Sequence, residues 1–384
     1  MERDELASWL RLTSADGVGN ATARKLLTRF GLPHEVLAQP PHRLHDFLTP
    51  PHAAALSVVS PELEARIDAA WTWLQAEPDA KTGSRHAIFV LGDPAYPESL
   101  LAMEDPPLML YALGRTELWP TLDTRRSLAV VGSRNPTPQG EATARDLSRG
   151  LVEAGLTVVS GLALGVDSAA HHGALDGAGD DDRHLATVAV VGTGLDRVYP
   201  RRNLALAHRI AARGLILSEY PLGTPPLAGN FPRRNRIIAG LARGTLVVEA
   251  ALKSGSLITA RLASEQGKDV FAVPGSIHAL QSRGCHALIK QGAKLVENLQ
   301  DVLDEIEPVG GRRGAPRASG EGASTPAATD PFLKDMGHDP IGLDALVART
   351  GISAARLQVK LLELELDGQV ARLPGGLYQR TVAA

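Results

Sequence analysis

One short segment of this chain places an aromatic residue beside three arginines. It reads Asn230-Phe231-Pro232-Arg233-Arg234-Asn235-Arg236, and an apolar stretch begins at Ile237. A phenyl ring can stack on an unpaired base, and guanidinium groups can hold phosphates or stack on bases themselves. The whole chain has a formal net charge of −3, so this basic, aromatic loop is a local feature. We interpret it as a candidate contact for single-stranded nucleic acid.

Phe231 itself has two possible roles. Pro232 biases the residue before it towards an extended backbone, which would hold the ring outward for a base. The alternative is that the ring fills the core beneath the loop. The candidate residues of this segment are Phe231, Arg233, Arg234, Asn235 and Arg236.

Several further loops carry groups that suit a phosphate backbone. Gly132-Ser133-Arg134 follows an apolar run. In this loop the glycine would let a ligand approach the backbone, the serine could donate a hydrogen bond, and the arginine suits a phosphate. Lys253 precedes a predicted helix start, where free N–H groups attract anions. Two plainer interpretations stay open: serine capping of that helix, and solvated arginines at positions 201 and 202. The candidate residues are Gly132, Ser133, Arg134, Gly161, Arg201, Arg202, Lys253, Ser254, Gly255, Ser256 and Thr259.

These loops contain no evident set of nucleophile, base and orienting group. Asp167 and His171 are four residues apart on one predicted helix face, so an acid–base pair or two metal ligands are conceivable. We favour a helix cap and a satisfied histidine, since no further ligand type stands nearby at metal spacing. The first loop is not GxGxxG and no acidic residue follows the second strand, which argues against a nicotinamide dinucleotide. We therefore expect binding without catalysis, and no cofactor or metal.

The elements that position the loops alternate between strand and helix from about residue 127 to 306. Helices are predicted at 139–154 and 167–175, and strands at 128–131, 157–159, 186–191, 215–217, 245–248 and 270–273. Continuous apolar strands separated by helices are typical of a parallel sheet covered on both faces. The expected fold class is α/β, a Rossmann-like, doubly wound, mostly parallel sheet. Ligands of such sheets bind beyond the carboxyl ends of the strands.

Four segments are expected along the 384 residues. Residues 1–80 form a helical domain of SAM or helix-hairpin-helix type, and 81–307 the extended Rossmann-like DNA-binding domain. Residues 308–337 are a flexible linker, because 308–330 are rich in Gly, Pro, Ala, Ser and Thr. Residues 338–384 show the helix–turn–helix–hairpin pattern of a winged-helix domain.

The two outer domains carry weaker functional signals. The turn at Asp16-Gly17-Val18-Gly19-Asn20 could offer N–H groups to a phosphate or simply join two helices. Ser353 can cap the second helix of the winged domain, which carries Arg356 and Lys360 but also three acidic residues near its end. That charge favours a protein-interaction or regulatory role over DNA reading.

Composition narrows the setting. One cysteine, Cys285, excludes a disulfide within the chain and fits the cytoplasm, where a small buried thiol is the simplest expectation. No signal peptide and no membrane-spanning run is evident, so no membrane partner is expected.

Taken together, the motifs resemble the DNA-processing protein A (DprA/Smf) family. They stand in order through residues 90–296, which makes the resemblance specific. The matching motifs are Tyr96-Pro97-x-x-Leu100, Pro106-Pro107-Leu108-x-Leu110-Tyr111, Val131-Gly132-Ser133-Arg134, Ser160-Gly161-x-Ala163-x-Gly165-Val166-Asp167 with His171, Gly192-x-Gly194-x-Asp196-x-x-Tyr199-Pro200, Ser218-Glu219-Tyr220-Pro221, Phe231-Pro232-x-Arg234-Asn235-Arg236, Ser254-Gly255-Ser256-Leu257-Ile258-Thr259 and Val273-Pro274-Gly275.

The resemblance implies a non-enzymatic protein of natural transformation. It implies that the chain binds incoming single-stranded DNA, forms a homodimer, loads the RecA recombinase and helps it overcome single-strand-binding protein. The DNA-pocket arginine and aromatic of the family map onto Arg134 and Phe231. A lysine that some members carry before that aromatic is absent here, where Leu227-Ala228-Gly229-Asn230 stands. The family's dimer region maps near His286, Leu288, Ile289 and Leu295, residues whose alternative role is packing inside the monomer.

Two other functions remain in view. One is a nucleotide-processing enzyme on the same fold, similar to the phosphoribohydrolases of the lysine-decarboxylase-like group. Gly244-Thr245 leads a predicted strand that ends at Glu249, which partly matches that group, but the PGG of its PGGxGT-type loop does not precede Gly244. The other is a protein-binding scaffold that does not bind DNA strands at all.

Overall fold

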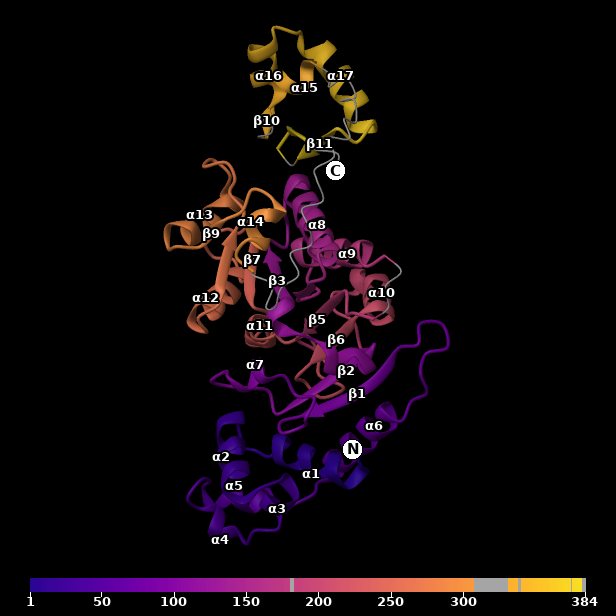
Figure 1. The fold of residues 1–384 in the computed structure, drawn as a ribbon, viewed down its shortest axis with the longest axis vertical. Helices are drawn as coiled ribbons and strands as arrows, with labels where there is room; N and C mark the ends of the chain where they lie inside the picture. Colours follow the sequence, from indigo (N-terminus) through magenta and orange to yellow (C-terminus); the bar gives the residue numbers. More distant parts are fainter. Residues whose placement is uncertain (180–182, 307–330, 338–339, 374, 382–384) are drawn as a thin grey trace.

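The computed structural model describes residues 1–179, 183–306, 331–337, 340–373 and 375–381. The chain runs from a helical N-terminal region through a large sheet to a small C-terminal domain (Figure 1). The described residues confirm the α/β class, the helical N-terminus and the winged-helix end.

The N-terminal region consists of short helices whose ends are marked in the sequence. Gly31 follows the second helix with φ of +94°, a conformation that glycine adopts without steric cost. Ser60 caps the last of these helices by accepting a hydrogen bond from the Leu63 N–H. The helices are α1 (Arg3–Ser14), α2 (Asn20–Phe30), α3 (Pro33–Leu37), α4 (Pro41–Leu44), α5 (Pro50–Ala55) and α6 (Pro61–Leu74).

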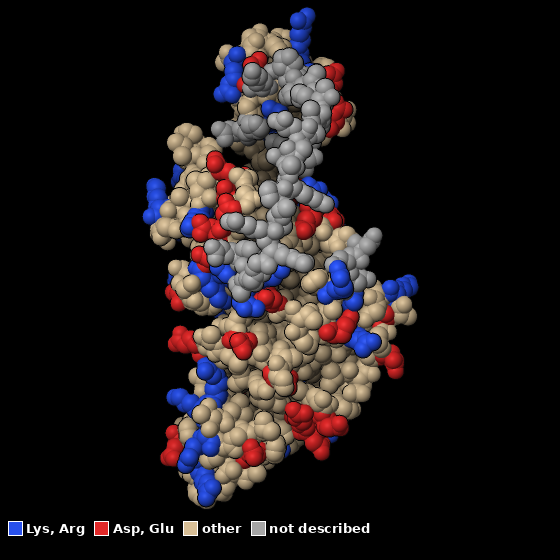
Figure 2. All heavy atoms as spheres, viewed as in Figure 1, with Lys and Arg blue, Asp and Glu red and all other residues tan. Residues whose placement is uncertain are grey.

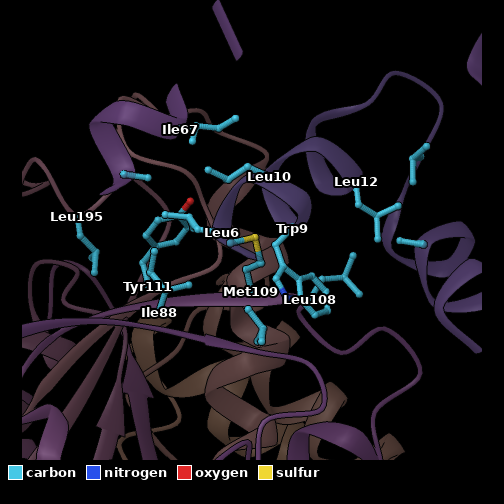
Figure 3. Packing of buried hydrophobic residues seen from close by; sticks show 14 of the residues in the cluster. Leu6, Trp9, Leu10, Leu12, Ile67, Ile88, Leu108, Met109, Tyr111 and Leu195 are labelled. Carbon is cyan, nitrogen blue, oxygen red and sulfur yellow. The ribbon is translucent and has the colours of Figure 1, made fainter. Parts of the chain in front are cut away.

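This helical region shares one hydrophobic core with the sheet. An antiparallel hairpin of β1 (Arg85–Val90) and β2 (Met109–Gly114) forms one sheet edge, and α1 packs on it. Figure 3 shows side chains of α1, including Leu6 and Trp9, facing Met109 and Tyr111 of β2. The helical region is therefore joined to the sheet by buried apolar contact as well as by the chain. Neither strand of this edge hairpin is predicted from the sequence.

Within the described residues the sheet has nine strands in the order β1-β2-β6-β5-β4-β3-β7-β8-β9. The chain starts the parallel part at β3, adds β4 to β6 on one side, and returns to add β7 to β9 on the other. This is the doubly wound arrangement, with its switch point between β3 and β7. The parallel strands are β3 (Ser127–Gly132), β4 (Thr157–Ser160), β5 (Thr187–Val191), β6 (Leu215–Ser218), β7 (Gly244–Val248), β8 (Asp269–Ala272) and β9 (Lys294–Leu295).

Helices cover both faces of the sheet, as continuous apolar strands require. Side chains of α11, α12 and α13 belong to one core cluster, and those of α8, α9 and α14 to another. Cys285 is fully buried in the first cluster, as expected. The covering elements are α7 (Glu98–Leu101), α8 (Pro138–Glu153), α9 (Val166–Gly177), α10 (Leu204–Arg213), α11 (Asn230–Gly240), α12 (Ser256–Glu265), α13 (Arg283–Lys290) and α14 (Leu299–Leu303), with 3-10 turns η1 (Thr116–Thr121), η2 (Thr124–Arg126), η3 (Arg201–Asn203) and η4 (Leu280–Ser282).

The C-terminal domain has the expected helices and hairpin, with two corrections. Helix α15 lies inside the predicted linker, and its Phe332, Leu333 and Met336 are buried in the domain core. The linker prediction is therefore wrong for this stretch, while 308–330 fall outside the described residues. Ser353 stands at the N-cap of α17, but its side chain makes no capping hydrogen bond. The elements are α15 (Pro331–Met336), β10 (Ile341–Gly342), α16 (Leu343–Thr350), α17 (Ala354–Leu366), β11 (Val370–Leu373) and β12 (Leu377–Arg380).

Candidate nucleic-acid interface

The carboxyl ends of the parallel strands bring the predicted loops to one edge of the sheet. The loop with Arg134 follows β3, Gly161 follows β4, and the loop with Tyr199 and Arg201 follows β5. The basic, aromatic segment was predicted to be a loop. It instead forms the first turns of α11. It begins at Asn230 and continues directly into the apolar residues that bury α11 against the sheet, so the segment is held on a rigid element.

Arg134, Phe231 and Tyr199 form a contact group at this edge. The Cζ atom of Arg134 lies 5.9 Å from the centre of the Phe231 ring, within the range of a cation–π contact. The ring centres of Tyr199 and Phe231 are 5.5 Å apart with an angle of 41° between their planes. Phe231 is half-buried, so it is neither a fully buried core residue nor a free surface ring.

The Phe231 ring is held by the glycine loop after β5. The Asn230 side chain donates a hydrogen bond of 3.0 Å from Nδ2 to the carbonyl oxygen of Gly192. A Cβ atom on Gly192 would lie 3.3 Å from Cδ1 of Phe231, a tighter approach than side chains normally make. Glycine at this position therefore lets the ring approach the main chain.

Arg234 does not face solvent, which corrects its expected role as a direct DNA contact. It is 4% exposed, and its Nη1 donates to the carbonyl oxygens of Gly161 and Val190. Its Nη2 lies 3.9 Å from Oδ2 of Asp167. Burial lowers the pKa of Arg234 to about 10 and raises that of Asp167. Arg234 thus joins α11 to the strand ends of β4 and β5.

Arg236 and Asn235 are also buried supports. Both Glu219 carboxylate oxygens accept hydrogen bonds from Nη2 of Arg236, at 2.5 Å for Oε2. The Asn20 side chain of α2 donates to Glu219 Oε1 at 2.9 Å, so the residue after the Gly17-Val18-Gly19 turn docks on the sheet domain. Asn235 donates from Nδ2 to the Gly255 carbonyl oxygen at 3.3 Å. These contacts correct the expectation that Arg236 and Asn235 meet DNA directly.

Four cations at this edge have no such partner. Arg134, Arg201, Arg202 and Lys253 are exposed, and none of them makes an ion pair or hydrogen bond with the described residues. Arg233 is half-exposed, and its nearest carboxylates, Asp105 and Glu219, lie at 3.9 and 4.0 Å. An unpaired guanidinium or ammonium group is available to a phosphate without first breaking an internal salt bridge.

The start of α12 is built differently from a serine-capped helix. Gly255 occupies the N-cap and makes no side-chain cap bond, while the hydroxyls of Ser254 and Ser256 lie 2.7 Å apart. Ser256 is 8% exposed and Thr259 1% exposed. Ser256 and Thr259 are therefore too buried to contact a DNA strand directly, contrary to the prediction. Lys253 and Ser254 remain accessible.

The predicted dimer residues lie at a separate place on α13 and β9. Leu295 is 45% exposed, whereas Leu288 and Ile289 are half-buried against the core. His286 Nε2 lies 2.9 Å from the Gly275 carbonyl oxygen. A cavity of about 610 Å³ opens between α12 and α13, and Leu257 and Leu288 are among its lining residues.

The residues considered for catalysis have separate partners. Nδ1 of His171 lies 2.7 Å from Thr187 Oγ1, while Asp167 accepts a hydrogen bond of 3.3 Å from the Ala163 N–H. Glu249 accepts hydrogen bonds from the Thr137 hydroxyl and, at 2.8 Å, from the Thr137 N–H at the start of α8. Burial raises the pKa of this carboxyl. Each group is thus engaged in holding a helix or strand.

Three general features of the described residues concern possible partners and ligands. Figure 2 shows basic and acidic side chains interspersed over the visible face, so no single basic face dominates it. No described helix is long and apolar enough to span a bilayer. Among the described ranges, no group of three or more His, Cys, Asp or Glu is placed to hold a metal ion.

The chain is thus a mixed α/β protein with a doubly wound sheet. The loops at the carboxyl ends of its parallel strands carry unpaired cations and an aromatic pair. Residues 87–307 match the family profile of the DNA recombination-mediator protein A, and residues 316–376 match the DprA winged helix domain. The chain belongs to the DNA recombination-mediator protein A family.

Relatives and solved structures agree with this assignment. Protein Smf of Escherichia coli K12 is 40% identical over 317 residues, 81% of this chain and 80% of that protein. DNA processing protein DprA of Streptococcus pneumoniae R6 is 48% identical over 230 residues, 59% of this chain and 77% of that protein. The X-ray structure of DprA from Streptococcus pneumoniae aligns with a TM-score of 0.66 at 36% identity, covering 80% of this chain and 99% of that one.

A second solved structure concerns DNA directly. It is described as giving structural insights into the single-stranded DNA binding mode of DNA processing protein A from Helicobacter pylori. It aligns with a TM-score of 0.51 at 34% identity, covering 58% of this chain and 95% of that one.

Proposed function

We propose that this protein binds single-stranded DNA at the edge formed by Arg134, Phe231 and the start of α12. The observation that carries the proposal is the exposed, unpaired guanidinium of Arg134 over the half-buried ring of Phe231. A single strand offers both a phosphate for the cation and an unstacked base for the ring. A duplex offers the phosphate alone, because its bases are stacked inside.

The proposed biological role is that of a recombination mediator. In this role the protein protects incoming DNA, acts beside single-strand-binding protein and loads RecA during natural transformation, in the cytoplasm. Membership of the recombination-mediator family supports it. The relative with a described single-stranded DNA binding mode supports the choice of strand.

The protein acts in this proposal as a homodimer and not as an enzyme. Exposed Leu295 and the cavity between α12 and α13, whose lining includes Leu257 and Leu288, support a second copy on that face. Two sites on one strand would raise affinity through effective concentration. The engagement of Glu249 with Thr137 supports a structural role for the one carboxylate that echoes the phosphoribohydrolases. Incubation with nucleoside monophosphates should release no free base.

The test is a titration of fluorescent single-stranded and blunt duplex oligonucleotides at several salt concentrations. Single strands should bind more tightly, with little sequence preference and a marked loss of affinity as salt rises. Equal affinity for both forms would contradict the proposal. A second assay measures RecA filament formation on DNA coated with single-strand-binding protein, which the protein should accelerate.

A further inference from the structure

One aromatic side chain at the interface is far more exposed than its neighbours. Tyr199 is 47% exposed, and it is the large aromatic residue that the described part of the chain leaves open to solvent. Its hydroxyl has no hydrogen-bond partner among the described residues. An exposed ring of this size at a strand-end loop can bind a ligand with a flat apolar face.

The geometry of the aromatic pair decides which faces a base can use. Two aromatic contacts of about 3.5 Å each require about 7 Å between ring planes, so a base cannot enter between rings whose centres are closer. The centres of Tyr199 and Phe231 are 5.5 Å apart, and Arg134 lies over Phe231 as well. Phe231 is therefore crowded by two side chains. The outward face of Tyr199 is the larger free aromatic surface of the group.

The chain after Tyr199 leads straight to two of the unpaired cations. Arg201 and Arg202 stand in the 3-10 turn η3, which ends at Asn203. Asn203 is buried, and its Nδ2 donates to the Leu162 carbonyl oxygen and to Ser168 Oγ, each at 2.9 Å. This anchor fixes the turn on the sheet edge, so the two arginines start from a rigid base beside the Tyr199 ring.

We propose that Tyr199 is a second base-stacking residue of the site and that it holds a nucleotide next to the one at Arg134 and Phe231. From Tyr199 the strand continues along η3, where Arg201 and Arg202 contact its phosphates. The inference rests on the proposed binding of single-stranded DNA. It extends that site to a track that runs from the loop after β3 to the loop after β5.

The test compares Tyr199→Ala, Tyr199→Phe and Tyr199→Leu in the full-length protein, with a short oligothymidylate as the probe. Stacking worth about 1–3 kcal/mol per base corresponds to about 5- to 150-fold in affinity, which Tyr199→Ala should lose. Tyr199→Phe should bind within a few-fold of the unchanged protein, because the ring is kept. Tyr199→Leu should bind like Tyr199→Ala, because it keeps apolar bulk but has no aromatic face.

Two controls test whether a loss of affinity in Tyr199→Ala comes from base stacking. Leu204→Ala removes another exposed apolar side chain of the same segment, 45% exposed, and should leave affinity unchanged. An oligothymidylate in which single positions in turn lack the base should show one position where the loss from Tyr199→Ala disappears. Thermal melting checks that each variant is folded.

The outcomes separate the inference from the function beneath it. If the unchanged protein binds the probe and Arg134→Ala weakens it while Tyr199→Ala does not, the stacking role of Tyr199 is wrong and the site stands. Rescue by Tyr199→Leu would also overturn it, since the side chain would then only support Phe231. If the unchanged protein fails to bind any single strand, the proposed function and this inference fall together.

Discussion

Arg234 lies buried beside Asp167, with 3.9 Å between Nη2 and Oδ2, and its guanidinium reaches the carbonyl oxygen of Gly161, just after β4, and that of Val190, within β5. Arg134, also at this edge, is exposed and unpaired among the described residues. The same residue type thus supports the site in one place and faces the ligand in the other. This contrast leads to opposite expectations for the two arginines.

Replacing Arg234 should lower the free energy of unfolding. Arg234→Met leaves Asp167 without its cation, and losing one partner of a buried pair costs about 3–5 kcal/mol. Denaturant unfolding should show this loss. Arg233→Ala is the matched control from the same helical turn, since its side chain is 50% exposed and should change stability by no more than about 0.5 kcal/mol. An Arg234→Met protein of normal stability that no longer binds DNA would instead make Arg234 a direct contact.

Replacing Arg134 should weaken DNA binding without destabilising the fold. If its guanidinium contacts one phosphate, Arg134→Ala should weaken binding to every sequence. It should also reduce the salt slope, which is the slope of log affinity against log salt concentration, by about one unit. If it stacks on a base instead, affinity should fall with little change in slope. Arg43→Ala, an exposed arginine of α4, is the control and should bind normally. Normal affinity in a folded Arg134→Ala protein would remove Arg134 from the site.

Phe231 should contribute to binding more than to stability. Phe231→Ala should lower affinity by about 5- to 150-fold and leave the salt slope nearly intact, because no charge is lost. Since the ring is half-buried, the loss of stability should stay below the roughly 3–5 kcal/mol typical of a fully buried phenylalanine. Oligonucleotide titration and melting temperature measure the two effects. Phe231→Trp should preserve binding; a stable Phe231→Ala protein with unchanged affinity would show that the ring does not stack.

The dimer proposal is tested best at Leu295, because this side chain is already 45% exposed in the single chain. Leu295→Glu should give a folded monomer in sedimentation experiments, with weaker binding to long single strands. Ile289→Glu should do the same if Ile289 lies in the interface, but should unfold the protein if its packing on the core dominates. Lys290→Glu, an exposed neighbour, serves as the charge control. A Leu295→Glu protein that remains dimeric would place the interface elsewhere.

Stability should fall in mild acid because of His171. Burial lowers the pKa of this histidine from 6.5 to about 3, so the unfolded chain takes up its proton before the folded one. The contribution of neutral His171 is complete above pH 6.5 and is lost progressively as pH falls towards about 3. The slope should approach about 1.4 kcal/mol per pH unit.

The measurement is denaturant unfolding across this pH range for the unchanged protein and His171→Gln. The difference between the two isolates the histidine from Asp167, whose raised pKa acts in the opposite direction. The variant should lose less stability on acidification, whereas His208→Gln, at an exposed position, should behave like the unchanged protein. Parallel curves for His171→Gln and the unchanged protein would contradict the prediction.

The sequence alone determined the parallel sheet and its helices. Apolar runs such as 128–131 and 245–248 are buried on both faces, and their spacing leaves room for helices that cover them. Local backbone conformation could be predicted where a single residue determines it, as at Gly31 and Gly155, which both have positive φ. The edge hairpin of β1 and β2 was not readable in this way, because its pairing with β6 and its cover by α1 join segments far apart in the chain.

Only the tertiary structure decided which residues of a motif face a ligand. Arg233, Arg234 and Arg236 stand within four positions, yet one is half-exposed and two are buried against Asp167 and Glu219. Tyr199 gains its place beside Phe231 because β5 and α11 meet at one sheet edge. Periodicity and turn chemistry act over a few residues, so the sequence displays them directly. Exposure and charge pairing depend on atoms brought together by folding, so they emerge only in three dimensions.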